Sequence, residues 1–238
     1  MKNLIYLLLL SMTIPSCKKE EARQVNQYTI EQFYTNTRFE GGTFSADETR
    51  LLVGSDETGI FNLYEITLAD GAKKQLTTST VESYYPVDYV PGMSALIYSA
   101  DKGGNEIDHL YLLEDNGKTT DLTPGENNKV SFFKWSEDKK SMFYISNIRD
   151  PKYFDVYKMN IGEWIPTLFY ENKSGLDVNE ISDDEKTLVV SKTVTTSENE
   201  LYLVNKETGT QTELSLPDQK GRYGVSGFSK DNKYVFYL

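Results

Sequence analysis

The chain has 238 residues, of which 38% are hydrophobic and 13% aromatic, enough to build the core of one large domain or two small ones. Its formal net charge of −11 makes nucleic acid an unsuitable partner, because phosphates require clustered Lys and Arg. The single cysteine, Cys17, and the single histidine, His109, exclude a disulfide framework and metal sites built from several Cys or His. No P-loop or dinucleotide-binding motif is present, so we expect no metal and no cofactor.

Residues 1–17 have the pattern of a secretory signal. Lys2 precedes an apolar run, Leu4–Leu10, that is too short to span a membrane. Ile14-Pro15-Ser16-Cys17 then resembles the bacterial lipobox, in which the cysteine is lipidated and becomes the first residue of the mature chain. The sequence therefore predicts a lipid anchor at Cys17, membrane attachment through that anchor, and a place in the bacterial cell envelope at the outer membrane. An ordinary signal peptide is the alternative.

Residues 18–37 are predicted to form a polar tether with a short helix. Lys19-Glu20-Glu21 resembles the Lys-acidic-acidic signal that some Bacteroidota lipoproteins carry for surface display. Thr29 and Gln32 have the spacing of a capping box, which predicts one helical turn at this point of the chain.

Residues 38–238 contain an internal repeat of about 46 residues. Turn aspartates recur at Asp47, Asp138, Asp184 and Asp231, with the turn Val90–Met93 in the place of a fifth. A tyrosine within an apolar run recurs at Tyr64, Tyr111, Tyr157 and Tyr202, and a leucine recurs at Leu76, Leu122, Leu168 and Leu214. Each repeat has four strand-like runs, which in the first are Phe39–Phe44, Leu51–Ser55, Phe61–Ile66 and Lys73–Thr77. Four strands in a period of this length are typical of a β-propeller blade.

The sequence thus predicts an all-β fold, an incomplete β-propeller with four blades from Arg38 to Leu216 and the first hairpin of a fifth in Tyr223–Leu238. The repeated Tyr and Leu residues are interpreted as packing between blades. Because Tyr234–Leu238 is apolar on both faces, further strands are expected to cover it. We therefore expect the chain to be part of a longer protein and to form an open arc of blades.

Several strings resemble known propellers. "FSADETRLLVGSDETGIFNLYEI" and "KQLT" are similar to TolB-like repeats. "YTIEQFYTNTRFEGGTFSADE", "DKGGNEIDHLYLLEDNGKTTDLTPGE" and "SNIRDPKYFDVYKMNI" resemble the N-terminal propeller of bacterial prolyl oligopeptidase family serine peptidases of the dipeptidyl- and acylaminoacyl-peptidase type. The resemblance covers most of Tyr28–Leu238. It implies a propeller that filters peptides by size before an α/β-hydrolase domain with a Ser-Asp-His triad, a domain that is missing here.

No catalytic residue is assigned in this chain. A nucleophile elbow needs Gly-x-Ser-x-Gly, and the nearest string is Gly224-Val225-Ser226-Gly227 in a predicted propeller strand. His109 begins a predicted third strand and is interpreted as a residue at the rim of a blade or between blades. The chain alone is expected to be inactive, and its part in an enzyme is left open.

The segment Ser146–Phe154 is predicted to be an irregular loop. The resemblance implies that this loop, with Arg149 and Asp150, faces the hydrolase domain or the substrate chamber, and that Arg149 pairs with a carboxylate. The alternative is a rim loop held by a local Arg–Asp contact.

Two functions remain open at this point. The first is the non-catalytic propeller portion of a secreted prolyl oligopeptidase family peptidase, whose partners are peptides and the missing hydrolase domain. The second is a stand-alone envelope lipoprotein whose propeller binds a protein or glycan.

The anchor at Cys17 gives a direct prediction. The wild-type chain should fractionate with membranes, and Cys17→Ala should release it or stall its processing, because the substituted chain has no site for the acyl chains. Metabolic labelling with a palmitate analogue should mark the wild-type chain only. An unlabelled wild-type chain would show that the lipobox interpretation is wrong.

Overall fold

The computed structural model describes residues 25–216 and 218–238. The chain divides into two compact units, 1–36 and 37–238, and each is described by itself. The predicted signal sequence, Cys17 and the motif at 19–21 lie outside the described residues. Among the residues that are described, no helix combines the length and the apolar character that a membrane span requires.

The described part of the first unit, residues 25–36, contains the short helix α2 (Ile30–Tyr34). Its N-terminus has the predicted capping box. The backbone N–H of Gln32 donates to Oγ1 of Thr29 over 3.3 Å, and the backbone N–H of Thr29 donates to Oε1 of Gln32 over 2.9 Å. Two N–H groups that the first turn leaves without a helical partner are satisfied in this way, so a helix of five residues can start here.

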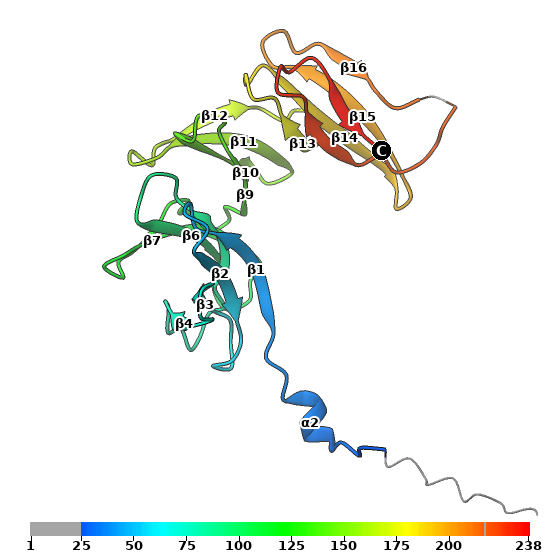
Figure 1. The fold of residues 1–238 in the computed structure, drawn as a ribbon. Helices are drawn as coiled ribbons and strands as arrows, with labels where there is room; N and C mark the ends of the chain where they lie inside the picture. Colours follow the sequence, from blue (N-terminus) through cyan, green and yellow to red (C-terminus); the bar gives the residue numbers. More distant parts are fainter. Residues whose placement is uncertain (1–24, 217) are drawn as a thin grey trace, which may run out of the picture. The chain divides into compact units, whose positions relative to one another are not determined.

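The second unit consists of four antiparallel sheets of four strands each and one two-stranded hairpin (Figure 1). Blade 1 contains β1 (Phe39–Phe44), β2 (Arg50–Ser55), β3 (Asn62–Thr67) and β4 (Lys73–Gln75). Blade 2 contains β5 (Tyr85–Tyr89), β6 (Ala95–Ala100), β7 (His109–Glu114) and β8 (Thr119–Asp121). Blade 3 contains β9 (Val130–Trp135), β10 (Ser141–Asp150), β11 (Tyr153–Asn160) and β12 (Pro166–Tyr170). Blade 4 contains β13 (Asp177–Ile181), β14 (Thr187–Thr195), β15 (Glu198–Asn205) and β16 (Gln211–Glu213). Hairpin 5 contains β17 (Val225–Phe228) and β18 (Val235–Tyr237).

In every sheet the strands pair in chain order, each with its sequence neighbour. This is the predicted all-β architecture of four blades and the first hairpin of a fifth. The strands predicted for the first repeat agree with β1–β4 to within about two residues at each end, which is the usual uncertainty of strand boundaries.

The first turn of most blades is fixed by a serine and an aspartate. In blade 3 the Ser136 hydroxyl donates to Oδ1 of Asp138 over 2.7 Å, and that oxygen also accepts from the Lys140 N–H over 3.1 Å. The residue between them, Lys139, has a φ of 57°. The same bonds recur at Asp47, Asp184 and Asp231, as the aspartate spacing predicts.

The turn bonds also act on the carboxylates. Hydrogen bonds from Ser45 and Thr49 lower the pKa of Asp47 to about 2, so this side chain is ionised at ordinary pH. Blade 2 has Val90–Met93 at the same point, and Gly92 adopts a φ of 71°, which glycine accepts without a Cβ clash.

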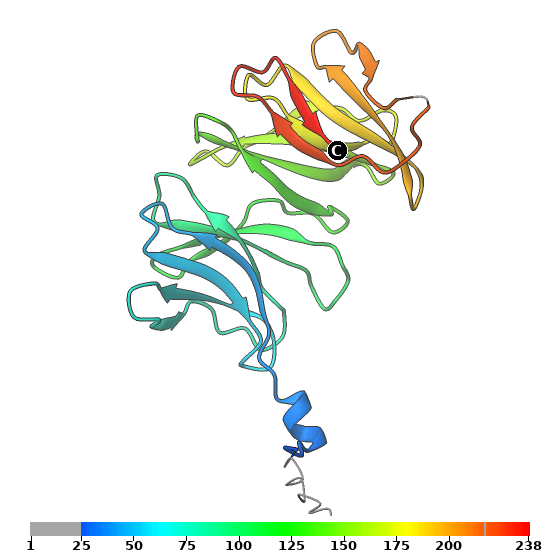
Figure 2. The ribbon, with the colours of Figure 1, turned by 45° about the vertical axis from the view of Figure 1, so that its right-hand side comes forward.

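Successive blades follow one another along the chain (Figure 2). Three apolar clusters of side chains join them. We call the face of a blade that packs on the next blade its forward face, and the opposite face its backward face. One cluster joins blades 1 and 2, another blades 2 and 3, and the third blades 3 and 4. Tyr111, Tyr157 and Tyr202 pack against these clusters from the backward faces of their blades. The prediction that the repeated tyrosines pack between blades is confirmed for these three.

The repeated leucine behaves differently in blade 3. Leu122 is buried in blade 2, but Leu168 is 48% exposed. In β12 the strand pairing shifts between Val156 and Tyr157, and Phe169 takes the position that faces the next blade. Phe169 packs edge to face on Phe143, with 4.8 Å between ring centroids. The interpretation of Leu168 as core was therefore wrong, because the register of a short edge strand does not follow the spacing of the repeat.

These neighbouring residues allow a matched test of the register. Phe169→Ala should destabilise the protein by about 2 kcal/mol, because it removes the contacts of the ring with blade 4. The expected loss is moderate because the ring is only half-buried. Leu168→Ala should change stability by less than about 0.5 kcal/mol, as is usual for an exposed side chain. Urea unfolding monitored by tryptophan fluorescence compares the two variants. A larger loss for Leu168→Ala would contradict the register seen in β12.

Candidate functional site

His109, the first residue of β7, is buried and engaged through both ring nitrogens. Nδ1 lies 2.8 Å from Oδ2 of Asp121, and Nε2 lies 2.9 Å from the carbonyl oxygen of Gly125. A carbonyl oxygen can only accept, so Nε2 carries a proton in this arrangement. Neither nitrogen is free to take a proton from a serine hydroxyl, which leaves His109 without the role of a catalytic base.

His109 belongs to a series of buried polar residues that anchor the blades. Asn62 and Asp155 lie at the corresponding positions, two residues before the repeated tyrosines. Asn62 accepts from the Ser79 N–H over 2.7 Å and donates to the Ser79 carbonyl over 3.0 Å. Each of these three residues therefore fastens the third strand of its blade to the connection that leads into the next blade.

The anchor positions are a pattern that sequence analysis missed. Asn62, His109 and Asp155 are spaced by 47 and 46 residues, in phase with the tyrosines. Because an amide, an imidazole and a carboxylate share no residue type, the repeat is visible only once the hydrogen bonds are known. His109 thus contacts its own blade and the connection that follows it.

Ser226 lies within β17 and is exposed. A nucleophile elbow places the serine on a tight turn between a strand and a helix, and the only helix among the described residues is α2, near the N-terminus. The residues that the structure describes also contain no cluster of His, Cys, Asp or Glu able to hold a metal ion. Neither His109 nor Ser226 has the surroundings of a catalytic residue.

The segment Ser146–Phe154 is not an irregular loop. β10 and β11 continue through it and leave only Pro151 and Lys152 as the turn, with a shift of register between Ser146 and Asp150. Pro151 occupies the turn itself, where its fixed φ is tolerated, so the two strands can continue up to it on either side.

Arg149 and Asp150 have different environments in this hairpin. The guanidinium of Arg149 makes a bidentate contact with the Asp155 carboxylate. Nε lies 2.6 Å from Oδ2, and Nη2 lies 2.9 Å from Oδ1. Nη2 also donates to the Asn172 carbonyl over 3.1 Å. Asp155 is fully buried, and its hydrogen bonds raise the pKa of Arg149. Asp150 accepts from the Lys152 N–H within the turn. Arg149 therefore pairs with a carboxylate of its own blade, and the proposed role facing a second domain stays a prediction.

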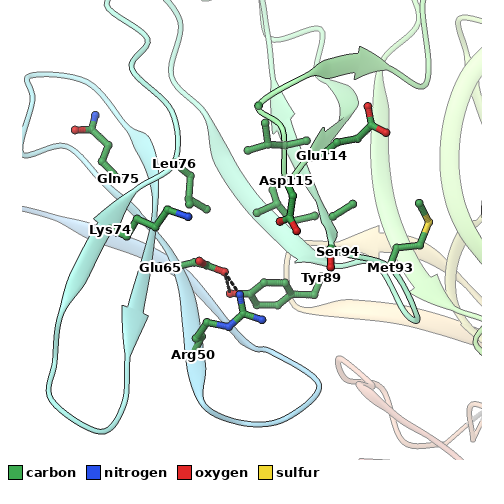
Figure 3. Close-up of a pocket in the computed structure, with 14 residues that line it drawn as sticks. Arg50, Glu65, Lys74, Gln75, Leu76, Tyr89, Met93, Ser94, Glu114 and Asp115 are labelled. Atoms are coloured by element: carbon green, nitrogen blue, oxygen red, sulfur yellow. Dashed lines mark hydrogen bonds and ion pairs between the residues drawn. The ribbon is translucent and has the colours of Figure 1, made fainter.

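A groove of about 260 Å³ lies between blades 1 and 2 (Figure 3). At its base, Oε1 of Glu65 accepts from Nη1 of Arg50 over 2.9 Å and from the Tyr89 hydroxyl over 2.8 Å. Burial and this bond to Glu65 raise the pKa of Tyr89. Lys74 and Asp115 also line the groove. The three residues at the base satisfy one another, so the groove presents polar contacts but no nucleophile with an adjacent base.

This architecture is shared with known proteins. A model of the family described as "Prolyl oligopeptidase, N-terminal beta-propeller domain" matches residues 87–237. No curated protein matches the chain.

Solved structures with a similar fold include three proteins. TolB from Acinetobacter baumannii superposes with a TM-score of 0.57 at 16% identity, covering 83% of this chain and 48% of TolB. A prolyl endopeptidase, from a study of inter-domain dynamics in catalysis and specificity, gives a TM-score of 0.58 at 18% identity, covering 82% of this chain and 32% of the endopeptidase. A puromycin-hydrolysing peptidase of Mycobacterium tuberculosis gives 0.53 at 16% identity, covering 79% of this chain and 32% of the peptidase.

The chain thus spans about half the length of that TolB and about a third of each peptidase. At these identities the solved structures show only that the fold is shared. The family model shows which family the chain is related to. With a matched region that takes in blades 2, 3 and 4 and hairpin 5, the chain belongs to the prolyl oligopeptidase N-terminal β-propeller family.

Proposed function

We propose that this chain is the non-catalytic propeller portion of a secreted prolyl oligopeptidase family serine peptidase, and that in the longer protein it limits which peptides reach a hydrolase domain. The observation that carries the proposal is the family match over residues 87–237. It is supported by the similar endopeptidase, of which this chain covers only 32%, so that most of that protein lies outside the shared propeller.

The hairpin of β10 and β11 is the part of the propeller best suited to contact a second domain. Pairing with β9 ends at Ser146, so the tip beyond it has no neighbouring strand on that side. Ile148 and Phe154, on this tip, are 55% and 39% exposed. The bidentate contact between Arg149 and Asp155 holds the base of the tip in place. A rigid support beneath exposed apolar side chains favours an interface over a mobile loop.

We also propose an envelope location for the protein. In this arrangement Cys17 carries the lipid anchor at the outer membrane, residues 18–37 form the tether, and residues 38–238 form the propeller. The lipobox-like run ending at Cys17 supports this location. The same run is compatible with the second candidate, a stand-alone envelope lipoprotein whose propeller binds a protein or glycan.

The purified chain should have no peptidase activity of its own. Dipeptidyl and aminoacyl chromogenic substrates should stay intact and a fluorophosphonate probe should not react, because His109 is held by Asp121 and Gly125 and Ser226 lies in a strand. A prolyl oligopeptidase family enzyme with its own hydrolase domain serves as the positive control. Probe labelling that disappears in Ser226→Ala would overturn this assignment.

The gating function is tested by reading the gene beyond the codon for Leu238 and by assaying the protein that the gene encodes. We expect the reading frame to continue past the codon for Leu238 into further blades and a Gly-x-Ser-x-Gly segment. The expressed protein should cleave short peptides at least about tenfold faster than a folded protein carrying the same cleavage site, and exposing the hydrolase domain should reduce that ratio. A stop codon directly after Leu238, or a ratio that the propeller does not change, would refute the gate.

A further inference from the structure

The groove between blades 1 and 2 opens above the apolar cluster that joins these two blades (Figure 3). Leu76, Leu96 and Leu113 form its apolar floor and belong to that cluster or pack against it. One wall is the forward face of blade 1, from which Glu65 and Lys74 project together, because they are directly paired across β3 and β4. The other wall is the backward face of blade 2, with the turn between β7 and β8. The groove thus combines an apolar floor with polar walls.

At the next two interfaces a side chain occupies the corresponding place. The position is the residue that directly follows the third strand of the later blade. Its backbone N–H donates to the residue before the second strand, with the carbonyls of Ser94, Lys140 and Lys186 as acceptors. In blade 3 this residue is Ile161, which packs against the cluster between blades 2 and 3. In blade 4 it is Lys206, whose Nζ lies 4.0 Å from the ring centre of Phe169, between blades 3 and 4. In blade 2 it is Asp115, and its short, charged side chain leaves the groove open.

Two opposite charges face the groove from its two walls. Lys74 of blade 1 and Asp115 of blade 2 both line it, and their charged ends point toward the space between the blades (Figure 3). Neither has an ion-pair partner among the described residues, whereas Glu114, next to Asp115, pairs with Lys118 over 3.5 Å. Two unlike charges on separate walls can be bridged by a molecule that carries both kinds of charge.

Arg50 supplies further donors at the base of the groove. Its Nη1 donates to Glu65, but a guanidinium carries five N–H donors in a fixed fork. The side chain of Arg50 is 45% exposed, so its other donors are accessible, whereas that of Glu65 is 12% exposed and is already engaged by Arg50 and Tyr89. Blade 1 therefore offers donors to an anionic group, and blade 2 offers the carboxylate of Asp115 to a cationic group.

The groove stays accessible in the longer protein that we expect. Its two walls belong to complete blades that already face each other, so blades after hairpin 5 would pack on other faces. Its lining lies at the turns that join the first strand to the second and the third to the fourth. The tip of β10 and β11 joins the second strand to the third, and successive turns of an antiparallel sheet lie at opposite ends. A second domain seated on that tip would therefore leave the groove open.

We propose that the groove between blades 1 and 2 binds a small zwitterion with an apolar side chain, of the size of an amino acid or a dipeptide. Lys74 and Arg50 hold its carboxylate, Asp115 holds its ammonium group, and the leucines of the floor hold its side chain. The groove volume of about 260 Å³ lies below the roughly 300–1,000 Å³ of typical ligand pockets, which limits the ligand to this size. The inference uses only blades 1 and 2 and is independent of the proposed peptidase function.

Binding is measured by titration of ligand-observed NMR signals on the full chain with Cys17→Ser, with L-leucine and the dipeptide Ala-Leu as probes. At least one probe should bind with a Kd of about 1 mM or below, the affinity that a low ligand efficiency gives for a molecule of this size. The tighter probe shows whether the ligand is a free amino acid or a dipeptide. If neither binds, the proposal is wrong.

Two substitutions test the charged contacts. Lys74→Gln and Asp115→Asn should each raise the Kd of the tighter probe at least about fivefold, because each removes a charge-assisted hydrogen bond. Lys118→Gln and Asp70→Asn are the matched controls, since they remove the same charges from exposed turn residues that do not line the groove. The controls should change the Kd by less than about twofold. Far-ultraviolet circular dichroism should show that all four variants stay folded.

Blocked probes assign each contact to its partner. An N-acetylated probe has lost its ammonium group, so the parent chain and Asp115→Asn should bind it equally weakly. A probe with a C-terminal amide has lost its carboxylate, so Lys74→Gln should weaken its binding no further. A substitution that weakened blocked and unblocked probes alike would act only through the fold and would contradict the proposed contact. Blocked probes that bind the parent chain as tightly as unblocked ones would contradict the zwitterion itself.

Discussion

The structure depends on the burial of the apolar faces that neighbouring blades turn toward each other. A four-stranded sheet with two apolar faces cannot be stable alone in water, and the three clusters between blades supply the cover. Leu52, Ile97, Phe143 and Val189 are almost fully buried because another blade or hairpin follows each of them. The strands, the turns and the polar anchors all serve to bring these faces together at a constant spacing along the chain.

The turns and the anchors act at opposite ends of a blade. The Ser–Asp turns fix the register of the first hairpin, so that residues such as Trp135 and Met142 face the preceding blade. Asn62, His109 and Asp155 fix the other end by binding the connection to the next blade. Local hydrogen bonds thus hold both ends of these blades, and apolar contacts fill the space between neighbouring sheets.

Much of the fold could be predicted from the sequence, because its determinants recur at a fixed spacing. The turns were predicted from the spacing of Asp138, Asp184 and Asp231. The packing between blades was predicted from the spacing of Tyr111, Tyr157 and Tyr202. The prediction that Leu168 packs between blades was wrong, because a one-residue slip in an edge strand of three to five residues leaves the repeat length unchanged. The prediction of a loop around Arg149 was wrong because β10 and β11 stay paired across a shift of register between Ser146 and Asp150, and such a shift leaves no regular pattern in the sequence. The anchor residues escaped notice because an amide, an imidazole and a carboxylate bind the connection through different backbone groups, so no residue type recurs.

The anchors also differ in how freely they can change during evolution. Asn62 supplies both a donor and an acceptor and carries no charge, so it binds its connection without a charged partner. Asp155 offers acceptors only, is fully buried, and relies on Arg149 to balance its charge. A lineage can therefore replace Asn62 in one step, whereas Arg149 and Asp155 must be exchanged together or through an intermediate with an unpaired buried charge. Blade 3 is for this reason the blade whose sequence is expected to drift most slowly at its anchor.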